Sequence, residues 1–195
     1  MTTTSTDKPS PVKSDRRHAL VLAAYHAIAE KGFEGLRVRD VAAQVGINGA
    51  TLHHYFPTKE DLIHGVVEYV IARLSETEEM EDNAAHPQQQ LHLHLTRLSR
   101  LMKKEPELFV VLTEINLRLQ RSPGAQFLAG HEKEWKNLLV GILQSGIEKG
   151  FWSGDLDPIA TASVIIASVE GASMWAVMDP IRGEQVLNQL EKLLM

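Results

Sequence analysis

Apolar side chains recur three and four positions apart along most of this 195-residue chain. That spacing places them on one face of an α-helix, whereas a half-buried strand would show strict alternation. No alternating segment and no internal repeat stands out in the sequence. We therefore predict an all-α fold.

The first predicted helix spans residues 15–31. Residues 1–14 are rich in Thr, Ser, Pro and Lys and have no apolar pattern, which predicts a mobile, disordered tail. Ser14 or Asp15 is placed to cap the helix, and Gly32 is placed to end it. The core-facing positions of this helix and of the residues just after it are Leu20, Ala23, Ala24, Ala27, Ile28, Phe33 and Leu36.

Residues 38–62 predict two short helices joined by a tight turn. The stripe of the first helix consists of Val38, Val41, Ala42 and Val45. Gly46 suits its end, because glycine adopts a left-handed backbone at no steric cost. Asn48 is placed to cap the second helix, and Ile47 and Leu52 flank that cap as a hydrophobic staple does. Such a pair is the helix-turn-helix unit, whose second helix enters the DNA major groove, although a plain corner inside a helical bundle has the same pattern.

The rest of the chain continues the helical spacing. Thr58 and Asp61 match a capping box that opens a long helix. Residues 76–90 are acidic and then polar, which predicts a loop or a domain boundary. Further helices are predicted at residues 91–102, 106–119, 123–149, 158–178 and 183–194. Gly141 and Gly146 weaken the prediction that the third of these is unbroken.

The helix predicted at residues 158–178 is apolar nearly all round. It also carries small residues, which are Ala160, Ser163, Ala167, Ser168, Gly171 and Ala172. A helix that is apolar on every side must be covered on every side. The few other helices of this domain can cover one side, so we expect a second subunit to cover the other. A central helix of a monomer is the alternative.

Several segments, in order and at the right spacing, resemble the DNA-binding signature of the TetR family of bacterial repressors. They are Val38-Arg39-Asp40-Val41-Ala42, Gly46-Ile47-Asn48 and residues 51–62, preceded by Ala23-Ala24 and Glu30-Lys31-Gly32-Phe33. The resemblance implies a helix-turn-helix DNA-binding domain at residues 15–60 and a helical ligand-binding and dimerisation domain at residues 61–195. It also implies a four-helix dimer interface, which we assign to residues 135–149 and 158–178.

The second helix of the motif is so short that few of its side chains can face DNA. Leu52 and Phe56 lie four positions apart and should point to the core. The residues left for DNA are Gly49, Ala50, Thr51, His53 and His54. Arg39 is the best candidate to read a guanine through two hydrogen bonds. Lys59 is poorly placed for the dipole of its own helix, which suggests a phosphate contact instead.

At four further positions, the residue of this chain is compared with the residue that is usual in the family. Arg37 stands where the family usually has a capping Ser or Thr; arginine cannot cap in that way, but it can bind a phosphate directly. Asn48 replaces a common serine, which is a conservative change for a cap. His53 replaces a common tyrosine, and Tyr55 matches a family aromatic that meets the DNA backbone.

Charge separates the two predicted domains. The whole chain carries −5, which by itself argues against nucleic acid. Up to Glu60 there are eight basic and six acidic side chains, so this part carries +2 and the rest −7. A mildly basic head on an acidic body fits a DNA-binding module joined to a separate ligand or partner domain.

The resemblance further implies an effector pocket in the body, between the helix that follows Thr58 and the helices of residues 91–150. Candidates to line it are Met102, Phe109, Leu112, Ile115, Trp135 and Met174. Apolar residues of this kind are more often plain core than pocket lining. Glu170 is the one acid within the helix that is apolar all round, and a structural or interface role is favoured for it. Glu114 borders an apolar stripe and is interpreted as solvated.

Little in the sequence indicates other chemistry. There is no cysteine, so no thiol nucleophile or thiolate metal site. His92 and His94 do not share a helix face, which argues against a metal site with His86 and His131 and favours solvated or capping histidines. No catalytic motif and no cofactor motif is present. No apolar run reaches the roughly 18 residues that a membrane span needs, and we expect a cytoplasmic protein.

The sequence is therefore interpreted as a ligand-responsive transcriptional regulator and not an enzyme. We expect a homodimeric repressor that binds a palindromic DNA operator and is released by a small-molecule effector. Two alternatives remain open. One is a regulator of this fold that responds to a protein partner or to no ligand. The other is a helical small-molecule binding protein that has lost specific operator binding.

Overall fold

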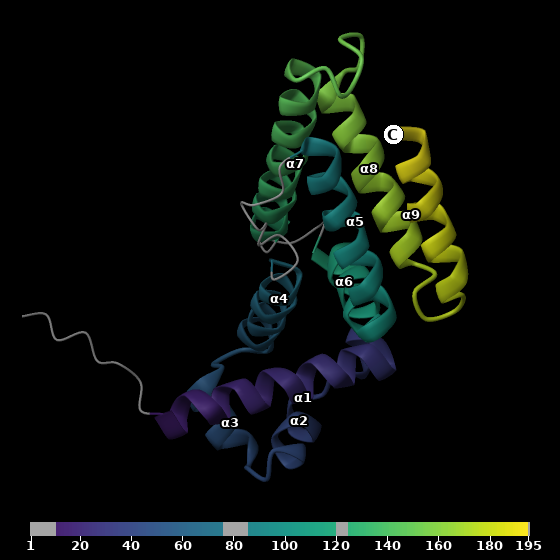
Figure 1. Cartoon of the computed structure of the whole chain (residues 1–195). Coiled ribbons are helices and arrows are strands. Elements are labelled where there is room, and N and C mark those ends of the chain that lie inside the picture. Colours follow the sequence, from purple (N-terminus) through teal and green to yellow (C-terminus); the bar gives the residue numbers. More distant parts are fainter. Residues whose placement is uncertain (1–10, 76–85, 120–124, 195) are drawn as a thin grey trace, which may run out of the picture. The chain divides into compact units, whose positions relative to one another are not determined.

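The computed structural model describes residues 11–75, 86–119 and 125–194, and within these ranges all regular structure is helical (Figure 1). The helices are α1 (Pro11–Gly35), α2 (Val38–Gln44), α3 (Gly49–Tyr55), α4 (Lys59–Ser75), α5 (Pro87–Lys104), α6 (Pro106–Leu119), α7 (Ala125–Glu148), α8 (Pro158–Ser173) and α9 (Pro180–Leu194). The predicted all-α fold is confirmed.

The chain forms two compact units, which meet between Tyr69 and Val70. We call the part up to Tyr69 the head and the part from Val70 onward the body. The division falls inside α4, whereas the sequence places the domain boundary at residue 60, where this helix begins. The reason is local packing, since Leu62 and Val66 in the first half of α4 are fully buried within the head.

The head is built on α1, with α2 packed on α1 and α3 packed on α2 (Figure 1). Helix α1 begins at Pro11, earlier than the predicted start, so the last residues of the predicted tail are helical; residues 1–10 lie outside the described part. Gly32 interrupts α1 at φ +64°, the position where the helix was expected to end. Of the predicted core positions only Ala27 is partly exposed; Leu20, Ala23, Ala24, Ile28, Phe33 and Leu36 are all buried.

The turn between α2 and α3 has the predicted chemistry. Gly46 adopts φ +73°, and its N–H donates to the carbonyl of Ala43 at 3.0 Å. The N–H of Ile47 reaches the carbonyl of Ala42 at 2.9 Å, which completes a Schellman ending. Asn48 then caps α3, because its Oδ1 accepts the N–H of Thr51 at 2.8 Å.

Helix α4 opens with the predicted capping box. The backbone N–H of Thr58 donates to the Asp61 carboxylate at 2.9 Å, and the N–H of Asp61 donates to the Thr58 hydroxyl at 3.0 Å. Two otherwise unsatisfied donors of the first turn are thus paired. The helix then runs without interruption from the head into the body.

In the body, α8 packs against both α7 and α9, and α5 contacts α6, α7 and α9 (Figure 1). The side chains that fill the space between these helices include Leu91, Leu95, Leu108, Val111, Ile115, Leu139, Leu143, Ala162 and Ile165, all of them almost inaccessible to solvent. A single apolar core therefore holds the body together.

Several body helices differ from prediction at their ends. Helices α5 and α9 begin earlier than predicted, at Pro87 and Pro180, because proline in the first turn starts a helix well. Helix α8 ends at Ser173, not at residue 178, since the chain turns and Asp179 then accepts the N–H of Arg182 at 3.1 Å to cap α9.

Helix α7 is continuous through both of its doubtful glycines. A Cβ at Gly146 would lie only 2.0 Å from the ring of Trp152, so glycine here allows that indole to pack directly against the helix. Close packing, not a helix break, explains this residue.

Candidate DNA-binding surface and body cavity

Helix α3 has one buried face and one exposed face. Leu52 and Phe56 are only 0% and 1% exposed, as predicted, and they fix the helix on the head core. The candidate DNA contacts Arg37, Arg39, Asn48, Ala50, His53 and His54 are exposed, whereas Gly49, Thr51, Tyr55 and Lys59 are half-buried. All of them lie on α2, on α3, or within a few residues of these helices.

The basic side chains of the head fall into two kinds. Arg17 has a structural partner, because its guanidinium lies 3.5 Å from Glu68 and stacks over the ring of Phe56 at 4.9 Å. Among residues 11–75, no hydrogen bond or ion pair engages the side chains of Arg37, Arg39 or Lys59. Cations that have no internal partner are available for phosphate or base edges.

Two unusual positions of the motif are resolved structurally. Arg37 is the N-cap residue of α2, and its side chain makes no capping hydrogen bond, as predicted for arginine. The ring of His53 lies with Nδ1 3.1 Å from the carbonyl oxygen of Pro57. Since a carbonyl only accepts, Nδ1 carries the proton in this contact and the orientation of the ring is fixed.

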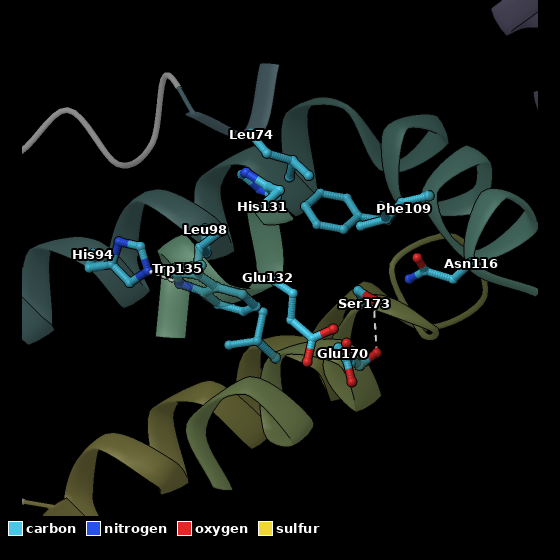
Figure 2. Close-up of a pocket in the computed structure, with 12 residues that line it drawn as sticks. Leu74, His94, Leu98, Phe109, Asn116, His131, Glu132, Trp135, Glu170 and Ser173 are labelled. Carbon is cyan, nitrogen blue, oxygen red and sulfur yellow. Dashed lines mark hydrogen bonds between the residues drawn. The ribbon is translucent and has the colours of Figure 1, made fainter. Parts of the chain in front are cut away.

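The body contains a cavity of about 700 Å³, counted with its open mouth (Figure 2). Its lining comes from α4, α5, α6, α7 and α8, and consists of Leu74, His94, Leu98, Phe109, Leu112, Asn116, His131, Glu132, Trp135, Val169, Glu170 and Ser173. Much of that volume is open to solvent, and the centre of a water-sized molecule can move through about 90 Å³ of it, so the enclosed part is narrow.

Half of the predicted pocket residues line this cavity, namely Phe109, Leu112 and Trp135. Ile115 does not reach it, because its side chain is fully buried in the core of the body. Met102 borders a different, much smaller hollow beside α8 and α9. Met174 lies past the end of α8 and is 62% exposed.

Histidine 94 is the lining residue that differs most from its predicted role. It is 1% exposed instead of solvated, and its Nε2 accepts the indole N–H of Trp135 at 2.8 Å. The sequence carries a signal for this burial, since His94 shares its helix face with Leu91 and Leu98. The described residues contain no cluster of three or more potential metal ligands.

Two carboxylates from different helices meet at the cavity. Glu132 comes from α7 and Glu170 from α8, and Figure 2 shows their side chains pointing toward one another. Both side chains are exposed to solvent to a large extent, yet partial loss of hydration, and then the negative charge of Glu132, raise the pKa of Glu170 above its ordinary value. The Ser173 hydroxyl donates to the backbone carbonyl of Glu170 at 2.8 Å, so it does not neutralise the pair.

Comparison with known proteins agrees with this architecture. Residues 20–66 match the family model described as "Bacterial regulatory proteins, tetR family". Over 156 residues the chain is 27% identical to the HTH-type transcriptional repressor KstR2 of Mycobacterium tuberculosis (strain CDC 1551 / Oshkosh). The aligned region covers 77% of this chain and 76% of that protein.

Two solved structures extend the likeness. The fold matches that of a TetR transcription regulator from Haloarcula marismortui ATCC 43049, with a TM-score of 0.82 at 23% identity over 92% of this chain and 96% of the other. It also matches the transcriptional regulator FadR from Bacillus subtilis in complex with stearoyl-CoA, with a TM-score of 0.76 at 25% identity over 91% and 96%.

A helix-turn-helix head on a helical body is the architecture of the transcriptional regulators to which this chain is similar. Within the chain, residues 20–66 match the model of the TetR family, and over about three quarters of its length the chain is similar to a repressor of the helix-turn-helix type. Within the described residues, no helix is both long and apolar enough to cross a membrane.

Proposed function

We propose that this protein is a homodimeric transcriptional repressor whose operator affinity is lowered by a small molecule bound in the body cavity. The observation that carries the proposal is the pairing of two sites in one chain. The head presents an exposed α3 face with cations beside it that have no internal partner within residues 11–75, and the body holds a partly open, largely apolar cavity. The cavity favours this proposal over a regulator with a closed, fully packed body.

The head would bind DNA with α3 in the major groove. We assign base contacts to the exposed face of α3 and to Arg39, whose guanidinium can bind a guanine through two parallel hydrogen bonds. Arg37 and Lys59 are assigned to phosphates, which supply affinity without sequence information. Asn48 acts through the cap that sets the angle of α3.

The body would form the dimer through α7 and α8. On α8 the small residues Ala160, Ser163, Ala167 and Gly171 are exposed along one face, together with Val164 at 56%. Small residues let two helices approach closely, and exposed apolar side chains beside them lose contact with water on association. A two-fold dimer would place its two α3 helices about 34–36 Å apart, one turn of DNA.

Helix α4 is suited to couple the two sites. It belongs to both units, and Leu74 at its C-terminal end lines the cavity. In the same turn Arg73 makes a two-point ion pair with Glu105, at the junction of α5 and α6, with one contact of 3.3 Å. A molecule that fills the cavity would contact this end of α4 directly and could bias the position of the helix.

The solved complex of the B. subtilis regulator with stearoyl-CoA supports a small molecule as the effector class. We assign no catalytic role to any residue. Since its partner is DNA, we place the protein in the cytoplasm.

The decisive experiment is selection of bound sequences from random DNA with the purified full-length protein, at several salt concentrations. We expect recovery of a two-fold symmetric motif. Weak binding without sequence preference would instead support the alternative of a ligand-binding protein that lacks an operator. Operator affinity is then measured with and without cavity ligands, which tests the effector role.

A further inference from the structure

We propose that the effector is an apolar molecule with a positively charged nitrogen, bound with its nitrogen at Glu132 and Glu170 and its apolar part in the body cavity. This inference rests on the proposed function, because it names the chemical class of the ligand of that cavity. The inference concerns the charge of the ligand, so an experiment can reject it and still support the effector role of the cavity.

Most of the cavity wall is apolar. Leu98, Leu112 and Val169 provide aliphatic surface, and Leu74 adds the end of α4. Burial of an apolar ligand against such surface is favourable by roughly 25 cal/mol per Å² of area removed from water. The wall therefore suits a hydrocarbon or aromatic moiety, and the few polar groups decide what else the ligand must carry.

Two of the polar groups in the lining are carboxylates. Glu132 and Glu170 approach each other from α7 and α8 (Figure 2), and the described lining includes neither lysine nor arginine. The basic groups of that lining are the imidazoles of His94 and His131. The first of these accepts the Trp135 N–H through Nε2 and so is held in a neutral form.

The two exposed carboxylates repel each other at the cavity. Both the partial burial of Glu170 and the charge of Glu132 disfavour its ionised form, which is why its pKa is raised. A cation between the two carboxylates removes the repulsion and replaces lost hydration with charge-assisted hydrogen bonds. An anionic group at the same place would add a third negative charge.

The aromatic residues of the wall favour a cation as well. The Trp135 indole is oriented by its hydrogen bond to His94 at 2.8 Å, and in Figure 2 its ring lies between that histidine and Glu132. Phe109 faces the cavity from α6. The faces of aromatic rings attract cations, most strongly for tryptophan and where water is excluded.

The test uses three probes that share one tail and differ in the charge of the head: phenylbutylamine, phenylbutanol and phenylbutyrate. Each is titrated calorimetrically into the full-length protein near neutral pH. We expect the amine to bind at least about tenfold more tightly than the alcohol, which corresponds to about 1.4 kcal/mol. The butyrate should bind most weakly.

Two variants test whether Glu132 and Glu170 bind the amine, and a third serves as the control. Glu170→Gln and Glu132→Gln should each weaken amine binding about tenfold and leave alcohol binding within twofold. Glu134→Gln makes the same change of charge on α7, at an exposed position outside the cavity lining, and should have no effect. Circular dichroism spectra of all three variants check that the fold is intact.

Tighter binding of phenylbutyrate or of octanoyl-CoA than of the amine would overturn the inference, and so would no binding of the amine at all. Amine affinity unchanged in both glutamine variants would overturn it too. The effector role is measured separately, as the operator affinity at saturating probe. If an anionic probe releases DNA, the proposed effector role of the cavity is supported and the inference that the effector is a cation is rejected. If the amine binds tightly but operator affinity does not change, the cation site is supported and the effector role is rejected.

Discussion

The head and the body of this regulator differ in how far apart along the chain their site residues lie. In the head, the turn, the cap and the exposed face of α3 fall within one short stretch, and Asn48 and Thr51 are joined over three positions. In the body, His94 and Trp135 are 41 positions apart, and the cavity draws on five helices. Local hydrogen bonds therefore shape one site, and tertiary packing shapes the other.

This difference implies that the two sites can be damaged independently. Phe56→Ala removes a ring that is 1% exposed in the head, and such truncations cost about 3–5 kcal/mol. We expect operator binding to be lost while phenylbutylamine binding changes less than twofold. Gel-shift and calorimetric titrations measure the two effects. Equal loss of both activities would show that head and body do not behave as separate units.

The proposed dimer surface is the next largest target. Val164→Glu places a charge on the exposed apolar face of α8, and burial of that charge should weaken the dimer at least about a hundredfold. Sedimentation velocity over a range of concentrations measures this change. Gln89→Glu adds a charge at an exposed position of α5 and is expected to leave the dimer intact. A stable dimer in the first variant would remove α8 from the interface.

A matched pair of glycine substitutions compares turn and helix. Gly46→Ala forces a side chain into a backbone with φ +73°, and should destabilise the head by about 1–2 kcal/mol. Gly130→Ala lies in α7 with open space around its Cβ, and should stabilise the body by about 0.5–1 kcal/mol. Urea denaturation of both variants measures the change in the free energy of unfolding and its sign. A neutral or stabilising effect of Gly46→Ala would contradict the assigned turn geometry.

The smallest effect concerns a single phosphate. Lys59→Ala should weaken binding to all DNA sequences to a similar extent and lower the slope of log affinity against log salt by about 1. Arg17→Ala is the control within the head, because Arg17 already pairs with Glu68 and lies over Phe56. An unaltered salt slope in the lysine variant would exclude Lys59 from the phosphate contacts.

Prediction from sequence succeeded where a residue acts on its near neighbours. Gly46, Asn48 and the pair of Thr58 and Asp61 have the roles expected of them, since each satisfies backbone groups only a few positions away. Helix ends that depend on proline were less accurate, as at Pro87 and Pro180. There the apolar pattern starts later than the helix, because first-turn residues need not face the core.

The cavity shows where such inference ends. Helical spacing identified Ile115 and Phe109 alike as apolar residues of α6, and only packing sends the first into the core and the second to the cavity. The resemblance to the family favours a structural or interface role for Glu170, and no sequence rule brings this residue opposite Glu132. His94 was interpreted as solvated, although its face of α5 is the buried one.

The sequence by itself determined the helical segments, the helix-turn-helix with its caps, and which face of α3 is buried and which is exposed. These depend on spacing and on hydrogen bonds between near neighbours, which are present in the sequence as written. The tertiary structure decided which side chains enclose the cavity and that two carboxylates from α7 and α8 share it. Such contacts depend on how whole helices pack, and the periodicity of one helix does not specify its neighbour.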